Sequence, residues 1–109
     1  MPVELGYFTL KVQDVARAKA FYGALFGWEF EANGHVRNTI FPVGLSTGGP
    51  IEVSFAYFKV ADLEAAVARL AALGGTVQQR ETYPSGPNAR CTDNQGTVFT
   101  LWQPAPGFE

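Results

Sequence analysis

Two stretches of the chain have the same order of residue types. Residues 10–27 read LKVQDVARAKAFYGALFG, and residues 58–75 read FKVADLEAAVARLAALGG. In each stretch an apolar run and a Lys-Val pair precede an Asp, and an Ala-rich segment follows that ends at Gly. The patterns on either side recur as well, which favours a duplicated strand–helix–strands module over a chance likeness between two amphipathic helices.

Each stretch carries the signals of a short helix. Asp14 and Asp62 are good N-caps, because an Asp carboxylate accepts a hydrogen bond from a backbone N–H that has no partner at the start of a helix. Apolar residues then recur at helical spacing. Gly27 and the pair Gly74-Gly75 stand where the two helices should end.

The rest of the chain has the pattern of strands and turns. Alternating residue types predict strands at residues 5–12, 28–32, 35–43, 53–60, 76–82, 89–92 and 97–103. We expect loops at 45–50 and 83–88, where Gly and Pro are concentrated. Module 1 then covers about residues 1–48 and module 2 about 49–109, within a single domain of residues 1–109.

Composition excludes several classes of function. The chain has 109 residues, 47% hydrophobic and 17% charged, which is typical of a globular protein. A net charge of −2 gives no basic field for nucleic acid, so we expect no nucleic-acid partner. The N-terminus has no signal-peptide pattern, and no apolar run is long enough to span a bilayer. With a single cysteine, Cys91, we expect a cytoplasmic protein without membrane contact.

Three segments resemble the vicinal oxygen chelate superfamily, which includes glyoxalase I, extradiol dioxygenases and bleomycin-resistance proteins. They are YFTLKVQDVARAKAFYGALFGWEF, VADLEAAVARLAALGGTV and DNQGTVFTLWQP, and the likeness covers nearly the whole chain. The resemblance implies an α+β fold of two βαβββ modules that form a curved mixed sheet, with the helices outside and a cleft inside. It also implies a homodimer that completes the cleft.

The resemblance implies where metal ligands would stand. Metal-dependent members place a His or Gln on the first strand of a module, seven residues before the capping Asp, and a Glu just before the final Leu of the last strand. Here those positions hold Tyr7, Phe55 and Thr100. A divalent cation needs several N or O ligands that converge on it. We therefore expect no metal and no cofactor.

An aromatic cleft remains as the candidate site. Alternation places four aromatic residues and Thr100 on the cleft side of the sheets: Tyr7, Phe55, Tyr57 and Trp102. The same aromatic residues would equally serve as ordinary core. Arg37 and Arg90 each follow a Gly closely, as if they were repeat equivalents, and would bind an anionic group if both face the cleft; otherwise they are surface arginines.

Three hypotheses follow for function. The first is a metal-free protein of the glyoxalase/bleomycin-resistance type that sequesters a partly aromatic small molecule in a dimer cleft. The second is a metal-dependent lyase, isomerase or dioxygenase with atypical ligands such as Glu52 and His35, so the question of catalysis stays open. The third is a regulatory module whose apolar cleft is filled by the dimer.

Overall fold

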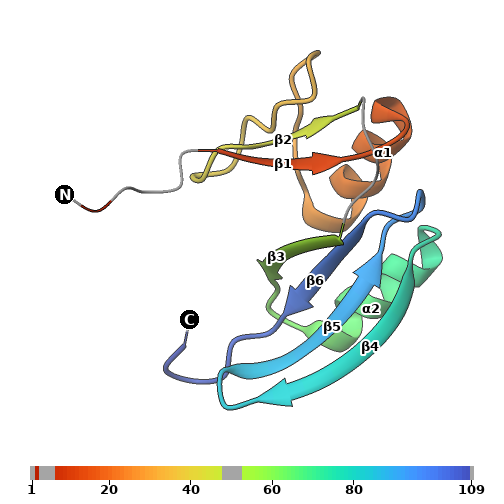
Figure 1. Ribbon diagram of the computed structural model, residues 1–109. Helices are drawn as coiled ribbons and strands as arrows, with labels where there is room; N and C mark the ends of the chain where they lie inside the picture. The colour runs from red at the N-terminus through yellow and green to blue at the C-terminus, as the bar shows by residue number, and fades with distance from the viewer. Residues whose placement is uncertain (1, 3–6, 48–52, 109) are drawn as a thin grey trace. The chain divides into compact units, whose positions relative to one another are not determined.

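The structure is a computed structural model that describes residues 2, 7–47 and 53–108, with no side chains described for residues 53–55. The chain divides into two compact units, Met1–Ile51 and Glu52–Glu109. Each unit has its own helix and its own parallel pair of strands (Figure 1).

The second unit forms a curved, mixed sheet with one helix (Figure 1). Its strand order is β3-β6-β5-β4, in which β3 and β6 are parallel and the other neighbours are antiparallel. This is the βαβββ arrangement expected for the second half. The elements are β3 Val53–Lys59, α2 Leu63–Ala72, β4 Thr76–Tyr83, β5 Gly86–Thr92 and β6 Val98–Trp102.

Helix α2 covers one face of this sheet and encloses the core of the unit. Leu63 and Leu70 are the buried residues of the helix. The fully buried sheet residues beneath it are Ala89, Cys91, Phe99 and Leu101. Burial of such apolar surface contributes most of the favourable free energy of folding.

The first unit has the same topology in a reduced form. Its strands β1 Phe8–Lys11 and β2 Val43–Ser46 are parallel, and the helix α1 Val15–Phe26 lies between them in the chain. Isolated antiparallel bridges join His35 to Gly44 and Phe30 to Val36, so two single bridges stand where the second unit has β5 and β4. The α+β class is therefore confirmed, with two helices and mixed strand pairing.

The duplication predicted from the sequence persists in individual hydrogen bonds. Asp14 Oδ1 accepts a bond of 3.1 Å from Arg17 N, and Asp62 Oδ1 accepts one of 3.1 Å from Ala65 N. Both aspartates are thus the N-caps that the sequence predicts. A second pair of hydrogen bonds also corresponds. In each unit, the residue after the first strand donates to the end of the last strand: Val12 N to Ser46 O and Val60 N to Trp102 O, both at 2.8 Å.

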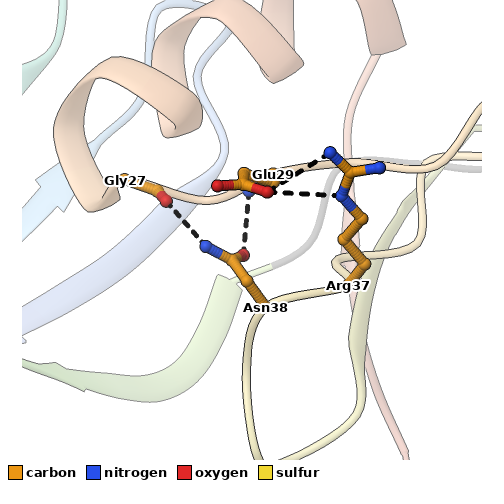
Figure 2. Close-up of polar contacts among 4 residues, drawn as sticks. All are labelled: Gly27, Glu29, Arg37 and Asn38. Atoms are coloured by element: carbon orange, nitrogen blue, oxygen red, sulfur yellow. Dashed lines mark hydrogen bonds and ion pairs between the residues drawn. The ribbon is translucent and has the colours of Figure 1, made fainter.

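The segments predicted as strands at 28–32 and 35–43 pair only over a short stretch, in which two backbone hydrogen bonds flank the Phe30–Val36 bridge. Beyond this stretch, Asn38 Nδ2 donates to Gly27 O at 3.0 Å and Asn38 Oδ1 accepts from Glu29 N at 2.9 Å (Figure 2). An Asn side chain that bonds the backbone in this way competes with strand pairing. The strand β2 instead begins at Val43 and includes residues 45 and 46 of the predicted loop, whose residues 48–50 lie outside the described part.

The predicted loop at 83–88 is also wrong. Strands β4 and β5 form a hairpin whose turn contains only Pro84 and Ser85. Gly86 already belongs to β5 and has φ 128, a conformation that favours glycine, and a Cβ there would overlap the Gln103 carbonyl oxygen. The longer β5 brings Asn88 into the sheet.

Candidate ligand-binding site

The sheet face of the second unit that points away from α2 carries the candidate site. Arg80 lies opposite Ala89 in the ladder, so their side chains point to the same face of the sheet. Arg80 forms an ion pair with Glu64 of α2, so this face is the one that the helix covers. Alternate residues on β5 therefore point to the other side. We call this side the α2-distal face; it carries Tyr57, Lys59, Gln79, Glu81, Tyr83, Asn88, Arg90, Thr100 and Trp102.

The strand register arranges these residues in two rows. Tyr57 lies opposite Thr100, and Thr100 lies opposite Arg90. In the next row Trp102 lies opposite Asn88. Residues directly opposite each other in neighbouring strands have Cβ atoms about 4.5–5.5 Å apart, so the members of each row are in reach of one another.

A hollow of about 330 Å³ opens on the α2-distal face. Its lining residues are Tyr57, Tyr83, Ser85, Asn88 and Trp102. Trp102 Nε1 donates a hydrogen bond of 3.1 Å to Ser85 O, which orients the indole ring, and the Tyr83 hydroxyl donates to Glu81 Oε2. The rings of Tyr57 and Tyr83 remain 58% and 49% exposed and can contact a bound molecule.

Two polar side chains on this face are nine-tenths buried. Asn88 and Thr100 are each 6% exposed. Among the described residues, no hydrogen bond involves the Asn88 carboxamide or the Thr100 hydroxyl. Neither residue is among those whose side-chain polar atoms are cut off from solvent without a partner, so the Asn88 carboxamide and the Thr100 hydroxyl stay accessible. A ligand in the hollow can therefore bond Asn88 in place of water.

The two arginines that the sequence singled out differ in their surroundings. Arg37 forms an ion pair with Glu29 at 3.3 Å, and both side chains are well exposed (Figure 2). Arg90 is half-buried, and within the described part of the chain its guanidinium has neither an ion-pair nor a hydrogen-bond partner.

The idea that Arg37 and Arg90 are repeat equivalents is wrong. Ser46 and Trp102 correspond, because each accepts the hydrogen bond from the residue that follows the first strand of its unit. Gly44 lies two residues before Ser46, and Thr100 lies two residues before Trp102, so Gly44 and Thr100 also correspond. His35 bridges to Gly44, whereas Arg90 lies opposite Thr100. His35 is therefore the counterpart of Arg90.

The remaining predicted site residues are Tyr7 and Phe55. Tyr7 is in the first unit, where its ring stacks on His35 with centroids 5.6 Å apart and an interplanar angle of 13°. Phe55 lies in β3, and its side chain is outside the described residues. The structure thus brings together Tyr57, Trp102, Thr100 and Arg90. Sequence reasoning missed Ser85 and Asn88, although Pro84-Ser85-Gly86 is a recognisable turn signal.

The donor set does not fit a divalent cation. No group of three or more His, Cys, Asp or Glu that could hold a metal occurs in the described residues. Thr100 is a poor ligand while protonated, and its counterpart Gly44 has no side chain. Glu52, the atypical ligand considered above, lies outside the described residues. We derive no chemical step through a metal.

Cys91 is a packed residue rather than a nucleophile. Its side chain is fully buried under α2, and Sγ donates to Ala89 O at 3.3 Å. Burial raises the pKa of the Cys91 thiol to about 11. Because the thiolate is the reactive form, this thiol stays inert near neutral pH.

Comparison with known families identifies the chain. Residues 7–102 match the family model of the glyoxalase-like domain. The chain belongs to this family. The glyoxalase-like chain is thereby a member of the vicinal oxygen chelate superfamily, as the sequence motifs indicated. None of the curated proteins matches it.

Solved structures share the fold of this glyoxalase-like chain. TnmS3, described as an antibiotic binding protein from a Streptomyces species, is 24% identical with TM-score 0.76, over 95% of this chain and 98% of that one. A glyoxalase/bleomycin resistance protein/dioxygenase family enzyme from Burkholderia phytofirmans is 16% identical with TM-score 0.76, over 94% and 100%.

A third structure is a mutant of the fosfomycin resistance protein FosX from Listeria monocytogenes, complexed with Mn(II) and 1S,2S-dihydroxypropylphosphonic acid. It is 18% identical with TM-score 0.78, over 97% of this chain and 94% of that one. At these identities the likenesses show the fold alone. Separately, neither helix of the described residues is long and apolar enough to cross a membrane.

Proposed function

We propose that this glyoxalase-like protein binds a small, partly aromatic molecule in the hollow of the α2-distal face and sequesters it without chemical change. The observation that carries the proposal is Asn88, which is 6% exposed, lines the hollow and has an accessible carboxamide without a hydrogen-bonding partner among the described residues. The volume of about 330 Å³ is at the lower end of the range for small-molecule sites.

The lining residues suit such a ligand. Tyr57, Tyr83 and Trp102 offer three aromatic rings around one polar anchor, the Asn88 carboxamide. Aromatic rings in offset or edge-to-face contact contribute about 0.5–1.5 kcal/mol beyond the burial of their area. The carboxamide can both donate and accept, so it would fix the orientation of a heteroatom on the ligand. The description of TnmS3 as antibiotic-binding supports this class of function.

The proposal includes a metal-free homodimer in the cytoplasm. The lack of a fitting donor set among the described residues supports binding without a metal. The exposure of Tyr57 and Tyr83 supports a second copy as a cover for the hollow, because large aromatic rings are common at interfaces. The free, buried Cys91 is compatible with a reducing compartment.

Native mass spectrometry of protein purified without chelators tests this assembly. We expect a two-chain mass with no metal. One metal ion per chain would contradict the proposal and support the metal-dependent lyase, isomerase or dioxygenase, with Glu52, His35 and the partner as the sources of ligands to examine.

A melting-temperature screen with small aromatic compounds tests binding. A ligand at one hundred times its Kd adds about 2.7 kcal/mol to the free energy of unfolding, which raises Tm measurably. We expect Trp102→Ala to remove most of the response and Trp102→Phe to keep much of it. An unchanged Tm across a broad panel would contradict the proposal and favour a regulatory module whose cleft is filled by the dimer.

A further inference from the structure

We infer that the ligand of the α2-distal face carries an oxyanion as well as an aromatic ring, and that Arg90 binds the oxyanion; this rests on the proposed function. Arg90 and Asn88 are two residues apart on β5, so both point to the same face. At a rise of about 3.3 Å per residue, their Cα atoms lie roughly 7 Å apart.

The charge of Arg90 is not neutralised within the described part of the chain. Glu81 is the nearby carboxylate of the same face, and it already accepts hydrogen bonds from the Tyr83 hydroxyl and from Gln79 Nε2, the latter at 3.2 Å. Arg80, the neighbour of Glu81 in sequence, points to the helix face and pairs with Glu64. Among the described residues, two cations therefore remain on this face: Lys59, which is exposed and lies opposite Trp102, and Arg90, which is half-buried. Arg90 is the stronger candidate for binding an anion, because the charge of a half-buried group is less screened.

The surroundings of Arg90 strengthen its interaction with an anion. Its side chain is half-buried, so a charge pair there is less screened than at an exposed site. Thr100 lies opposite Arg90 in the ladder, and its hydroxyl has no hydrogen bond within the described residues, so it can donate to the same oxyanion. A planar guanidinium binds carboxylate or phosphate oxygens through two parallel hydrogen bonds.

The ligand class follows from this arrangement. The aromatic ring lies between Tyr57, Tyr83 and Trp102, a polar ring atom bonds Asn88, and the oxyanion reaches Arg90 and Thr100. A neutral aromatic compound would fill the hollow and leave Arg90 unpaired. The site should therefore prefer an aromatic acid to its neutral amide.

Isothermal titration with matched probes tests the inference. The probes are 2-naphthoate, 2-naphthyl phosphate and 2-naphthamide, which share one ring system and differ in charge. We expect the two acids to bind at least about tenfold more tightly than the amide, because hydrogen bonds to charged groups are the stronger ones. Comparing the two acids distinguishes a carboxylate from a phosphate ligand. Equal affinity of all three probes would overturn the inference and leave the proposed function standing.

Two arginine variants localise the effect. Arg90→Gln should abolish the preference for the acids while the affinity for 2-naphthamide stays within about twofold. Arg37→Gln removes an equal charge from the exposed pair with Glu29 and should leave the preference intact. Loss of the preference in both variants would indicate a general charge effect and contradict a site at Arg90. Circular dichroism would verify that both variants fold.

Two measurements on the unaltered protein complete the test. Raising the salt concentration should weaken the binding of 2-naphthoate more than that of 2-naphthamide, because only the acid forms an ion pair. If none of the three probes binds, and neutral naphthalene and indole derivatives also fail to raise Tm, the proposed function itself is wrong and the inference is lost with it.

Discussion

Asn88 lies directly opposite Trp102 in the β5–β6 ladder, and its carboxamide has no hydrogen-bonding partner among the described residues. The neighbouring indole, in contrast, is anchored by a hydrogen bond from Nε1 to Ser85 O. One of the two residues is satisfied within the fold and the other is not. Trp102 therefore presents an indole ring of fixed orientation, beside an Asn88 carboxamide that is available to bond a ligand.

Replacing Asn88 by leucine should separate stability from binding. Asn88→Leu removes a solvent-accessible carboxamide that makes no hydrogen bond within the described residues, so we expect the free energy of unfolding to change by less than about 0.5 kcal/mol. The same change should weaken ligand binding, because the anchor in the hollow is lost. Urea denaturation and titration with 2-naphthoate measure the two effects. A loss of stability together with unchanged affinity would contradict the role of Asn88.

Asn38 supplies the matched control. Its side chain bonds both Gly27 O and Glu29 N, so it is satisfied where Asn88 is not (Figure 2). Asn38→Leu should lower the free energy of unfolding by about 0.5–1.5 kcal/mol, since it removes two exposed hydrogen bonds to the backbone. A clear loss of stability in Asn38→Leu and almost none in Asn88→Leu is the expected result.

The two N-caps should contribute unequally. Asp14→Ala should cost about 1 kcal/mol of stability, the usual effect of losing such a cap. Asp62→Ala should cost less, because Gln103 Oε1 also accepts a hydrogen bond at the start of α2, from Leu63 N at 2.8 Å. Chemical denaturation of both variants and of Gln103→Ala measures this difference. A larger loss in Asp62→Ala than in Asp14→Ala would contradict a role for Gln103 at the helix start.

Gly44 sets the position of Tyr7. A Cβ at Gly44 would overlap the Tyr7 hydroxyl, so Gly44→Ala should displace the ring and end its stacking on His35. We expect a loss of about 0.5–1.5 kcal/mol, the range for aromatic pairs. In a Tyr7→Ala background, Gly44→Ala should cost almost nothing further, because the two changes remove the same contact. Additive losses would show that Gly44 is constrained by another neighbour.

Cys91 should make the protein sensitive to alkali. Burial raises the pKa of the folded-state thiol to about 11, whereas the thiol of the unfolded chain has its ordinary value of 9.0. Between these values the unfolded state loses its proton first, so this contribution to stability is complete below pH 9 and decreases as pH rises towards 11. Melting curves of the wild type and Cys91→Val should diverge from pH 9 upward. Rapid reaction of the folded protein with a thiol reagent at pH 8 would contradict the burial.

The sequence predicted the second unit better than the first. Asp62, the apolar spacing after it and the closing Gly pair are local signals, and the structure has α2 where they indicate. The residues 28–43 have a pattern that resembles strands, yet they pair only around the Phe30–Val36 bridge, and beyond it Asn38 bonds the backbone. Strand β2 is short and contains Gly44, and its partner β1 is distant in sequence, so no local pattern reveals it.

The candidate site was likewise predictable only in part. Period-two alternation placed Tyr57, Thr100 and Trp102 on one face, and their ladder positions agree. Asn88 was not found, because Pro87 suggested a loop, whereas in the structure Pro87 pairs with Thr82 near the start of β5. The lack of a hydrogen bond to Asn88 is a tertiary property that no sequence pattern contains.

The most direct test of the account is the NMR signal of the Asn88 side-chain amide in a metal-free buffer. Its two N–H resonances are identified by their loss in Asn88→Leu and are followed during a titration with 2-naphthoate. The account predicts that these resonances shift with increasing ligand, together with the indole N–H of Trp102, while the side-chain amide of Asn38 stays in place. Binding that shifts other residues and leaves the Asn88 amide unchanged would contradict the central claim.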